Sequence, residues 1–158
     1  MSEVHRIGLI SDTHGMLRGG VHDALAGVEL ILHAGDVGGD VILDELELIA
    51  PVLAVYGNTD VPGDPRLAES IERTIGGVRI HVSHGHELGA PTPAKLLPRY
   101  SADVIVFGHT HRQLVVEAEG RLVVNPGAAG ARRFNLEASC ALLEIADGRA
   151  SVEIIPLA

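Results

Sequence analysis

Five short apolar segments recur along the chain, and none of them alternates strictly between apolar and polar residues. Runs of about four to eight residues rich in Val, Ile and Leu are typical of strands covered on both faces. The segments are VHRIGLIS (4–11), VELILHAG (28–35), PVLAVYG (51–57), VRIHVSHG (78–85) and ADVIVFG (102–108). We therefore predict five strands in one mostly parallel sheet.

Helical spacing separates the early strand segments. Residues 19–27 and 39–50 place apolar side chains three and four positions apart, and Asp40 is suited to the N-cap of the second helix. Residues 92–100 predict a third helix with Pro93 in its first turn. Strands that alternate with helices indicate the α/β class.

The C-terminal third has a different pattern. Residues 111–127 predict a β-hairpin that turns at Glu119-Gly120, and residues 138–157 predict another that turns at Asp147-Gly148. We expect these hairpins to form a second, mainly antiparallel sheet packed on the first. The 158 residues suit one domain spanning 1–158.

Each apolar segment ends in a side chain that can bind a metal ion. These side chains are Asp12, Asp36, Asn58, His84 and His109, spaced 24, 22, 26 and 25 residues apart. Such a spacing corresponds to a strand, a crossover and the next strand. Because ligand sites form beyond the carboxyl ends of parallel strands, we expect all five groups at one edge of the sheet.

Two further histidines join this set. His14 stands in SDTHG, and His111 stands beside His109 in FGHTHR, a pair that taken alone also suits a solvated strand end or a packed histidine. Seven oxygen and nitrogen ligands without a thiolate indicate Mn, Fe or Zn in a catalytic site rather than a structural zinc. Seven ligands are too many for one tetrahedral ion, but two ions that share a carboxylate can use all of them. Two divalent ions, two aspartates and a bridging hydroxide have a formal charge of about +1, which suits a phosphate ester.

Composition narrows the functional classes. The chain has 12 Lys and Arg against 21 Asp and Glu, a net charge of -9, an aromatic fraction of 3% and no Trp. Without a basic stripe or stacking platform, a polymeric nucleic acid is not the expected partner. The single Cys140 excludes an internal disulfide and is expected to be buried. No apolar run has the length of a signal or a membrane span, so we expect a cytoplasmic protein that binds no membrane.

The ordered motifs resemble those of the calcineurin-like metallophosphoesterases, whose pattern is D-x-H, G-D, G-N-x-D or G-N-H-[DE], H and G-H-x-H. Here they read SDTHG, HAGDV, YGNTD, SHGHE and FGHTH. The resemblance extends from Ile7 to about Gly130 and includes NPGAAG, which is similar to the NPGS of the small single-domain phosphodiesterase branch. It implies a sandwich of two β-sheets flanked by helices.

The resemblance also implies a site and an activity. One ion is assigned Asp12, His14, Asp36 and His111, and the other Asp36, Asn58, His84 and His109. The implied cofactors are two divalent ions, Mn first and Fe, Zn or Ni as alternatives. Asp36, Asn58 and His84 are the implied catalytic residues of a hydrolase of small phosphate esters, a phosphodiesterase before a phosphomonoesterase, whose nucleophile is a metal-bridging hydroxide.

Residues around the motifs keep two interpretations. His33 and His86 either orient ligands, contact phosphate or pack in a strand end, and Asp60 is expected to orient the Asn58 loop. Two interpretations also apply to Gly127 and Gly130, at turns or close to the site, and to Arg132 and Arg133, as a phosphate clamp or in solvent. His5, His22 and His81 have no other ligand candidates beside them and are expected at surface or sheet positions.

One position departs from the family pattern. Thr59 stands where many relatives carry the histidine of GNH[DE], which protonates the leaving oxygen, although the small phosphodiesterase branch also tends to lack that histidine. The candidate substrate contacts are therefore Asn58, Thr59 and His86. Alternative functions are a noncatalytic scaffold, since some relatives of this fold serve vesicle-coat assembly, and a nuclease, which the charge of -9 disfavours. A homo-oligomer remains open.

Overall fold

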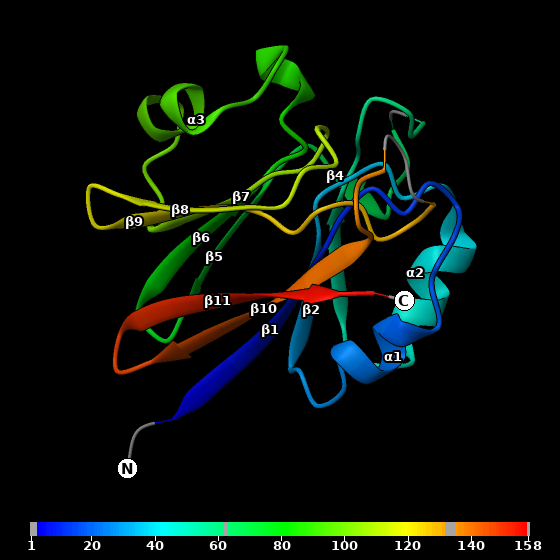
Figure 1. Cartoon of the computed structure of the whole chain (residues 1–158), viewed down its shortest axis with the longest axis horizontal. Helices are drawn as coiled ribbons and strands as arrows, with labels where there is room; N and C mark the ends of the chain where they lie inside the picture. The colour runs from blue at the N-terminus through cyan, green and yellow to red at the C-terminus, as the bar shows by residue number, and fades with distance from the viewer. Residues whose placement is uncertain (1–2, 62, 132–134, 158) are drawn as a thin grey trace.

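Two β-sheets pack face to face in the computed structural model of the chain, which describes residues 3–61, 63–131 and 135–157. Helices α1 and α2 cover the outer face of the first sheet, and α3 covers the outer face of the second (Figure 1). The predicted α/β class, with two sheets in a sandwich flanked by helices, is confirmed.

The first sheet is mostly parallel at its centre. In spatial order its strands are β11 (Arg149–Pro156), β10 (Ser139–Ala146), β1 (Val4–Ile10), β2 (Leu30–His33), β3 (Val52–Val55) and β4 (Leu67–Ala68). Strands β1 to β4 pair in parallel, whereas β10 pairs antiparallel with both β1 and β11. The second predicted hairpin therefore exists, but it extends the first sheet.

The second sheet is mixed. In spatial order its strands are β5 (Ile71–Ile75), β6 (Val78–Val82), β7 (Val104–Val106), β9 (Arg121–Asn125) and β8 (Leu114–Ala118). The central strands β6, β7 and β9 are parallel, and the edge strands β5 and β8 are antiparallel to their neighbours. The first predicted hairpin, β8–β9, belongs to this sheet.

The predicted strands are present, but their assignment to a single parallel sheet is wrong. The segments ending near His84 and His109 form β6 and β7 of the second sheet. The physical reason lies between Asn58 and His84, where the chain forms β4 and β5 instead of a crossover helix and turns from β5 into β6 at Gly76-Gly77. Strand β5 already belongs to the second sheet, so the chain passes from one sheet to the other between Ala68 and Ile71.

The helices are short: α1 (Gly20–Ala24), α2 (Asp40–Glu47), the 3-10 helix η1 (His86–Leu88) and α3 (Pro93–Arg99). Thr92 caps α3 and Pro93 occupies its first turn, as predicted. The N-cap of α2 is Gly39, at φ 122° and ψ 165°, so the prediction of Asp40 at that position is wrong. Glycine tolerates this backbone conformation, and the helix has already begun at Asp40. None of the helices in the described ranges combines the length and the apolarity that crossing a membrane requires.

Three hydrophobic layers explain why the strand segments lack alternation. In β1, Ile7 and Leu9 point between the sheets, whereas Ile10 points toward α1 and α2. Burial on both faces makes every position apolar. Cys140 lies in β10 at 0% exposure, which confirms its expected burial, and burial raises the pKa of its thiol to about 12.

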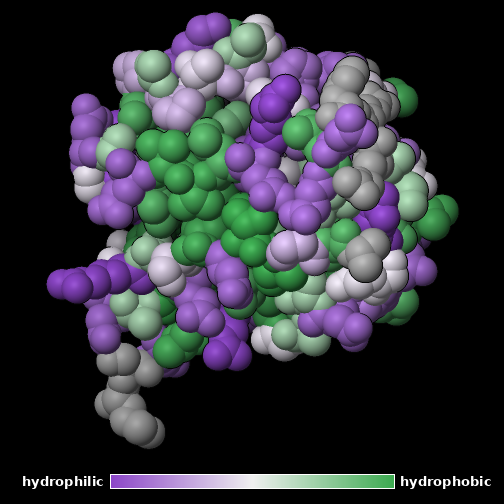
Figure 2. Space-filling view, viewed as in Figure 1, coloured by the Kyte–Doolittle hydropathy of each residue, from purple (hydrophilic) through white to green (hydrophobic). Residues whose placement is uncertain are grey.

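The sandwich is less completely covered between the edge strands β8 and β11. Figure 2 shows hydrophobic residues reaching the surface in this region of the view. Val152 and Ile154 of β11 are only partly buried, although they pack against the layer between the sheets. This face lies away from the loops that follow β1, β2 and β3.

Candidate metal centre

The seven predicted ligands lie in loops that follow strands of both sheets. Asp12 and His14 follow β1, Asp36 follows β2, and Asn58 follows β3 of the first sheet. His84 follows β6 of the second sheet, and His109 and His111 follow β7. The structure brings all seven together, because their ligand atoms form a connected set of close distances.

The first group contains Asp12, His14 and His111. The Nε2 atoms of the two histidines lie 3.2 Å apart. Oδ1 of Asp12 lies 3.6 Å from His14 Nε2 and 3.3 Å from His111 Nε2. All three ligand atoms lie within 4.8 Å of one another, as a single metal ion requires.

The second group contains Asn58, His84 and His109. Oδ1 of Asn58 lies 3.1 Å from His84 Nε2 and 3.2 Å from His109 Nδ1. Asp36 lies between the groups, since its Oδ2 is 3.3 Å from His84 Nε2 and 3.6 Å from His14 Nε2. This is where a carboxylate shared by two ions would stand.

The cluster fits divalent metal ions. Ligands bound at about 2.0 to 2.2 Å from one ion stand about 3.0 to 3.5 Å from their neighbours, which matches most of the separations above. Oδ1 of Asp12 supports the same conclusion, because it is buried and has no hydrogen-bond partner among the described residues. A buried carboxylate oxygen left in this way is costly unless a cation balances it.

Each carboxylate has one oxygen held by the protein. Oδ2 of Asp12 accepts hydrogen bonds from Ser11 Oγ at 2.6 Å and from the His109 amide at 3.2 Å, and Oδ1 of Asp36 accepts one from the Thr59 amide at 2.9 Å. Burial acts to raise the pKa of both carboxyls, but the neighbouring histidines and hydrogen-bond donors outweigh it. The pKa of Asp12 falls far below its usual range, and that of Asp36 falls to about 2. Both groups are therefore charged.

The orientation of His84 is fixed from behind. Its Nδ1 donates a hydrogen bond to the Ala34 carbonyl at 2.7 Å, so Nε2 faces the cluster. Burial acts to lower the pKa of His84, but the hydrogen bond to Asp36 and the charges of Asp12 and Asp36 raise it. For His109, burial and then the charge of His84 lower the pKa.

Backbone strain is concentrated at the predicted ligands. Eight described residues other than glycine have positive φ angles, and five of them are Asp12, His14, Asp36, His109 and His111, with values from 47° to 70°. Such conformations cost of order 1–3 kcal/mol each and persist where the surrounding structure enforces them. This observation marks the site independently of any motif.

Two glycines let the loops approach the carboxylates. A Cβ atom on Gly57 would lie 2.1 Å from Asp36 Oδ1, and one on Gly108 would lie 2.1 Å from Ser11 Oγ and 2.6 Å from Asp12 Oδ2. The glycines of the GN and GH motifs are therefore required by space, which spacing in the sequence does not reveal.

Asp60 holds the two loops around Asp36 together. Its carboxylate accepts hydrogen bonds from the backbone amides of Gly57, Val37 and Gly38 at 2.9, 3.1 and 3.1 Å. Both carboxylate oxygens are thus engaged by backbone amides of the two loops, which agrees with the orienting role expected for Asp60. A carboxylate that accepts three amide hydrogen bonds is held in one position.

His33 has a comparable place beneath the loops. It is fully buried, its Nδ1 accepts the Gly35 amide at 3.1 Å, and its Nε2 donates to Thr13 Oγ1 at 3.0 Å. The Thr13 hydroxyl in turn donates to the Val37 carbonyl at 2.7 Å. Burial lowers the pKa of His33 to about 4, so it is a neutral connector between the loops of Asp12 and Asp36.

Three supporting residues were not predicted from the sequence: Ser11, Thr13 and Asn125. The side-chain amide of Asn125 donates to the Gly108 carbonyl at 3.1 Å and to Thr110 Oγ1 at 3.0 Å, while its oxygen accepts the Gly127 amide at 2.9 Å. It thereby fixes the loop of His109 and His111. The NPG segment was the available signal, but its role depends on a tertiary contact.

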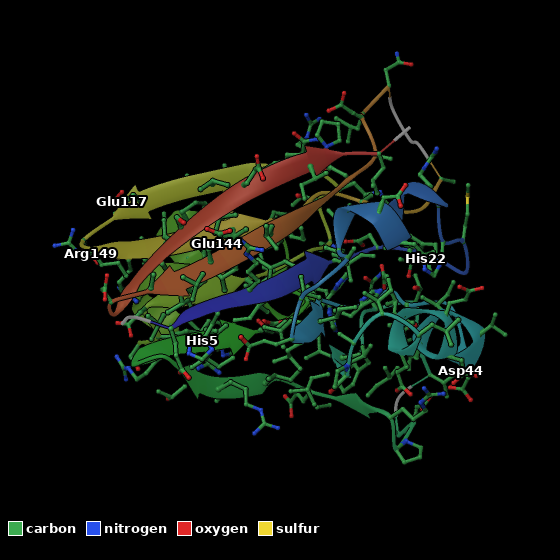
Figure 3. All side chains as sticks on the ribbon, turned by 90° about the horizontal axis from the view of Figure 1, so that it is seen from below. His5, His22, Asp44, Glu117, Glu144 and Arg149 are labelled. Carbon is green, nitrogen blue, oxygen red and sulfur yellow. The ribbon has the colours of Figure 1, made fainter. Side chains whose placement is uncertain are left out.

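The remaining candidates divide into near and distant ones. The ring of His86 lies 5.3 Å from that of His84, and Thr59 adjoins Asn58 with its amide on Asp36. Gly127 and Gly130 are packed closely against Ser139 and Thr13. The structure places His81 in β6 and shows His5 and His22 near the surface, away from the cluster (Figure 3). Arg132 and Arg133 lie outside the described residues.

The fold and the cluster are those of a metal-binding α/β sandwich. The sequence model of the calcineurin-like phosphoesterase superfamily domain matches residues 6–148. A probable metallophosphoesterase of Methanothermobacter thermautotrophicus is 36% identical over 159 residues, covering 94% of this chain and 91% of that protein. The chain therefore belongs to the calcineurin-like phosphoesterase superfamily.

Two further comparisons refine this result. A phosphodiesterase of Methanocaldococcus jannaschii is 29% identical over 140 residues, covering 77% of this chain and 82% of that protein. The structure of vacuolar protein sorting 29 from Cryptosporidium parvum superposes with a TM-score of 0.81 at 24% identity, covering 98% of each chain. The second likeness establishes the fold alone.

Proposed function

We propose that the protein is a dinuclear metal-dependent phosphodiesterase that acts on small phosphate esters. The observation that carries this proposal is the position of Asp36 Oδ2, 3.3 Å from a histidine of one ligand group and 3.6 Å from a histidine of the other. One carboxylate oxygen shared by two groups is the arrangement that a pair of ions needs. Mn is the first choice, with Fe, Zn and Ni as alternatives.

The residues divide the work as follows. Asp12, His14 and His111 hold one ion, Asn58, His84 and His109 hold the other, and Asp36 serves both. When bound, such a pair of ions lowers the pKa of a water molecule and neutralises the charge of a phosphoryl group. Asp60 and His33 hold the ligand loops in position through hydrogen bonds, so the ligand side chains need little rearrangement to bind the ions.

Thr59 and His86 border the open side of the second group. Thr59 cannot deliver a proton as an imidazolium does near neutral pH, which favours esters whose leaving oxygen needs little protonation. The net charge of -9 also favours the single negative charge of a diester over the double charge of a monoester. We therefore place phosphodiesterase activity before phosphomonoesterase activity.

The test is a metal titration combined with an ester panel. Protein stripped with a chelator is reloaded with Mn, Fe(II), Zn or Ni, its metal content is measured, and hydrolysis of bis(p-nitrophenyl) phosphate is compared with that of p-nitrophenyl phosphate. We expect two ions per chain and faster hydrolysis of the diester. One ion per chain at saturation refutes the dinuclear site, and two bound ions without hydrolysis of either ester favour a noncatalytic scaffold.

A further inference from the structure

Both tyrosines of the chain line one small cavity beside the candidate metal centre. The sequence contains two Tyr and no Trp, with an aromatic fraction of 3%. Tyr56, after β3, and Tyr100, after α3, border a cavity of about 180 Å³ together with His86. Aromatic side chains that converge from distant parts of a chain poor in them point to a ligand.

His86 forms the wall between this cavity and the metal ligands. Its ring centroid lies 5.3 Å from that of His84 and 6.4 Å from that of His109 on one side. On the other side it lies 6.4 Å from the ring of Tyr56. A molecule held at the second ligand group can therefore extend past His86 into the cavity.

The Tyr100 side of the cavity is fixed in place. Its ring stacks on that of His81 with centroids 3.7 Å apart, and its hydroxyl donates to Glu87 Oε2 at 2.9 Å. Oε1 of Glu87 accepts the Gly85 amide at 3.0 Å. A wall ordered in this way loses little conformational entropy when a ligand binds.

The polar groups behind the Tyr100 wall are hydrogen-bonded to one another. Ser83, which also lines the cavity, lies 3.0 Å from His81 Nε2, and His81 Nδ1 is hydrogen-bonded to Glu72. His86 Nδ1 has no hydrogen-bond partner within the described ranges, but this atom is buried and does not open onto the cavity. The ring walls are therefore the main contacts that the cavity offers a ligand.

Size and charge restrict the ligand. A cavity of about 150 Å³ holds a benzene ring, so the volume of about 180 Å³ suits one small ring system and excludes a lipid chain. The charged side chains that line it are Glu69, Glu87 and Arg99, an excess of negative charge that disfavours a second phosphate. An uncharged flat ring fits both limits.

We propose that the cavity bounded by Tyr56, His86 and Tyr100 binds an uncharged planar ring carried by one ester arm of the substrate, such as an aryl or nucleoside group. This inference rests on the proposed function, because the phosphoryl group must be held at the metal ligands while the ring enters the cavity. It makes Tyr56 the specificity-determining ring, because the Tyr100 ring is already stacked on His81 and has the Arg99 guanidinium carbon 5.0 Å from its centroid.

Tyrosine fluorescence tests the cavity directly, without any turnover. Because the chain has no Trp, its emission arises from Tyr56 and Tyr100 alone. Mn-loaded protein is titrated with phenylphosphonate and with cyclohexylphosphonate, which has a similar size but no flat ring, and calorimetry supplies the Kd values. We expect phenylphosphonate to alter the emission and to bind about threefold to tenfold more tightly, the range for one aromatic contact.

Variants locate the preference. In Tyr56→Leu the ratio of the two Kd values should fall to about one, whereas Tyr56→Phe should retain it, since the ring is kept. Equal Kd values in the unmodified protein, or a ratio that survives Tyr56→Leu, overturn the proposal. The unmodified protein alone can refute it, so the test does not depend on the folding of a variant.

A second measurement separates this inference from the proposed function. Hydrolysis of phenyl p-nitrophenyl phosphate is compared with that of methyl p-nitrophenyl phosphate, which has the same leaving group. A phenyl advantage of about threefold to tenfold in kcat/KM that is lost in Tyr56→Leu supports the cavity, and a ratio that Tyr56→Leu leaves unchanged counts against it. Hydrolysis of neither ester, with two ions bound, refutes the proposed function while the phosphonate titration still decides the cavity.

Discussion

The two halves of the candidate metal centre differ in their access to solvent. In the first half, Asp12 is 0% and His111 8% exposed, and His14 is partly buried. In the second half, Asn58 is exposed and His109 is only partly buried, although His84 is buried. We therefore expect the first half to retain its ion better and a substrate to approach from the second half.

Charge and backbone geometry follow the same division. Besides Asp36, the carboxylate of Asp12 lies closer to the first half, at 3.3 and 3.6 Å from its histidines, than to His84 Nε2 at 3.9 Å, whereas Asn58 gives the second half an amide. All of Asp12, His14 and His111 have positive φ angles, but in the second half only His109 does. The first half, which we call the closed half, therefore has more residues with positive φ angles and more carboxylate charge. We expect it to bind its ion more tightly than the second, open half.

Asp36→Asn removes the group on which both halves depend. We expect kcat/KM for bis(p-nitrophenyl) phosphate to fall by about 10³-fold, the upper range for losing one polar group of an active site. The matched control is Asp44→Asn on the exposed face of α2 (Figure 3), which should leave activity unchanged. A smaller loss, about 10 to 100-fold, is expected for His86→Ala, which removes a wall of the neighbouring cavity but no metal ligand. Equal losses in Asp36→Asn and His86→Ala, with metals retained, would contradict the assignment of the bridge.

His14→Ala and His109→Ala remove one imidazole from each half and could break the comparison. We expect Mn to bind the unmodified protein in two steps of different affinity. His14→Ala should weaken the tighter step by about tenfold or more, and His109→Ala the weaker one, because each loses a ligand from a different ion. Equilibrium dialysis at limiting Mn measures both. If the two variants lose the same step, the halves are not distinct.

Thr59→His sharpens the comparison on the open half. A positioned general acid contributes about 10² to 10⁴-fold, so the variant should raise turnover most for esters with poor leaving groups. We expect a gain of about tenfold or more for alkyl esters and a flatter dependence of rate on leaving-group pKa. An unchanged slope in a variant that still holds two ions would mean that position 59 does not face the leaving oxygen.

The buried His33, which supports the loops of the closed half, should make the stability of the protein depend on pH. Its pKa is lowered from 6.5 to about 4 by burial, so below pH 6.5 the unfolded chain takes up a proton that the folded protein refuses. Stability should therefore fall as the pH drops from about 6.5 to 4, by about 2 kcal/mol at pH 5. Urea unfolding of metal-free protein measures it.

The control for this measurement is His33→Gln, which cannot titrate. His84 acts in the opposite direction, because its raised pKa adds stability as the pH falls, and Asp36 loses stability only below its ordinary pKa of 3.8. The difference between the unmodified protein and the variant isolates His33. Parallel pH profiles would show that His33 titrates normally in the folded protein.

The sequence predicted the elements whose causes are local. The strand segments were visible because both faces are buried, and the turns at Glu119-Gly120 and Asp147-Gly148 were visible because their left-handed backbone favours such residues. The order of the motifs likewise predicted which seven side chains would form the candidate metal centre. These signals depend on neighbours in the chain.

The features that were not predicted correctly depend on contacts between residues far apart in the sequence. The assignment of strands to sheets was wrong because parallel pairing is decided by partners far away in sequence, and β4 and β5 were missed because they are a two-residue bridge and a largely exposed edge strand. The clash that requires Gly57 and the meeting of Tyr56 with Tyr100 arise only in three dimensions.

The pairing of β1 with β10 has a consequence for the order of folding. Val4 faces Ala146 in this pair, so a central strand of the first sheet waits for a partner made more than a hundred residues later. All seven metal-ligand candidates precede β10 in the chain. During synthesis, at about 5–20 residues per second, all seven side chains are therefore made before β10 is available to pair with β1. We expect the ions to bind late, after β10 has joined the first sheet.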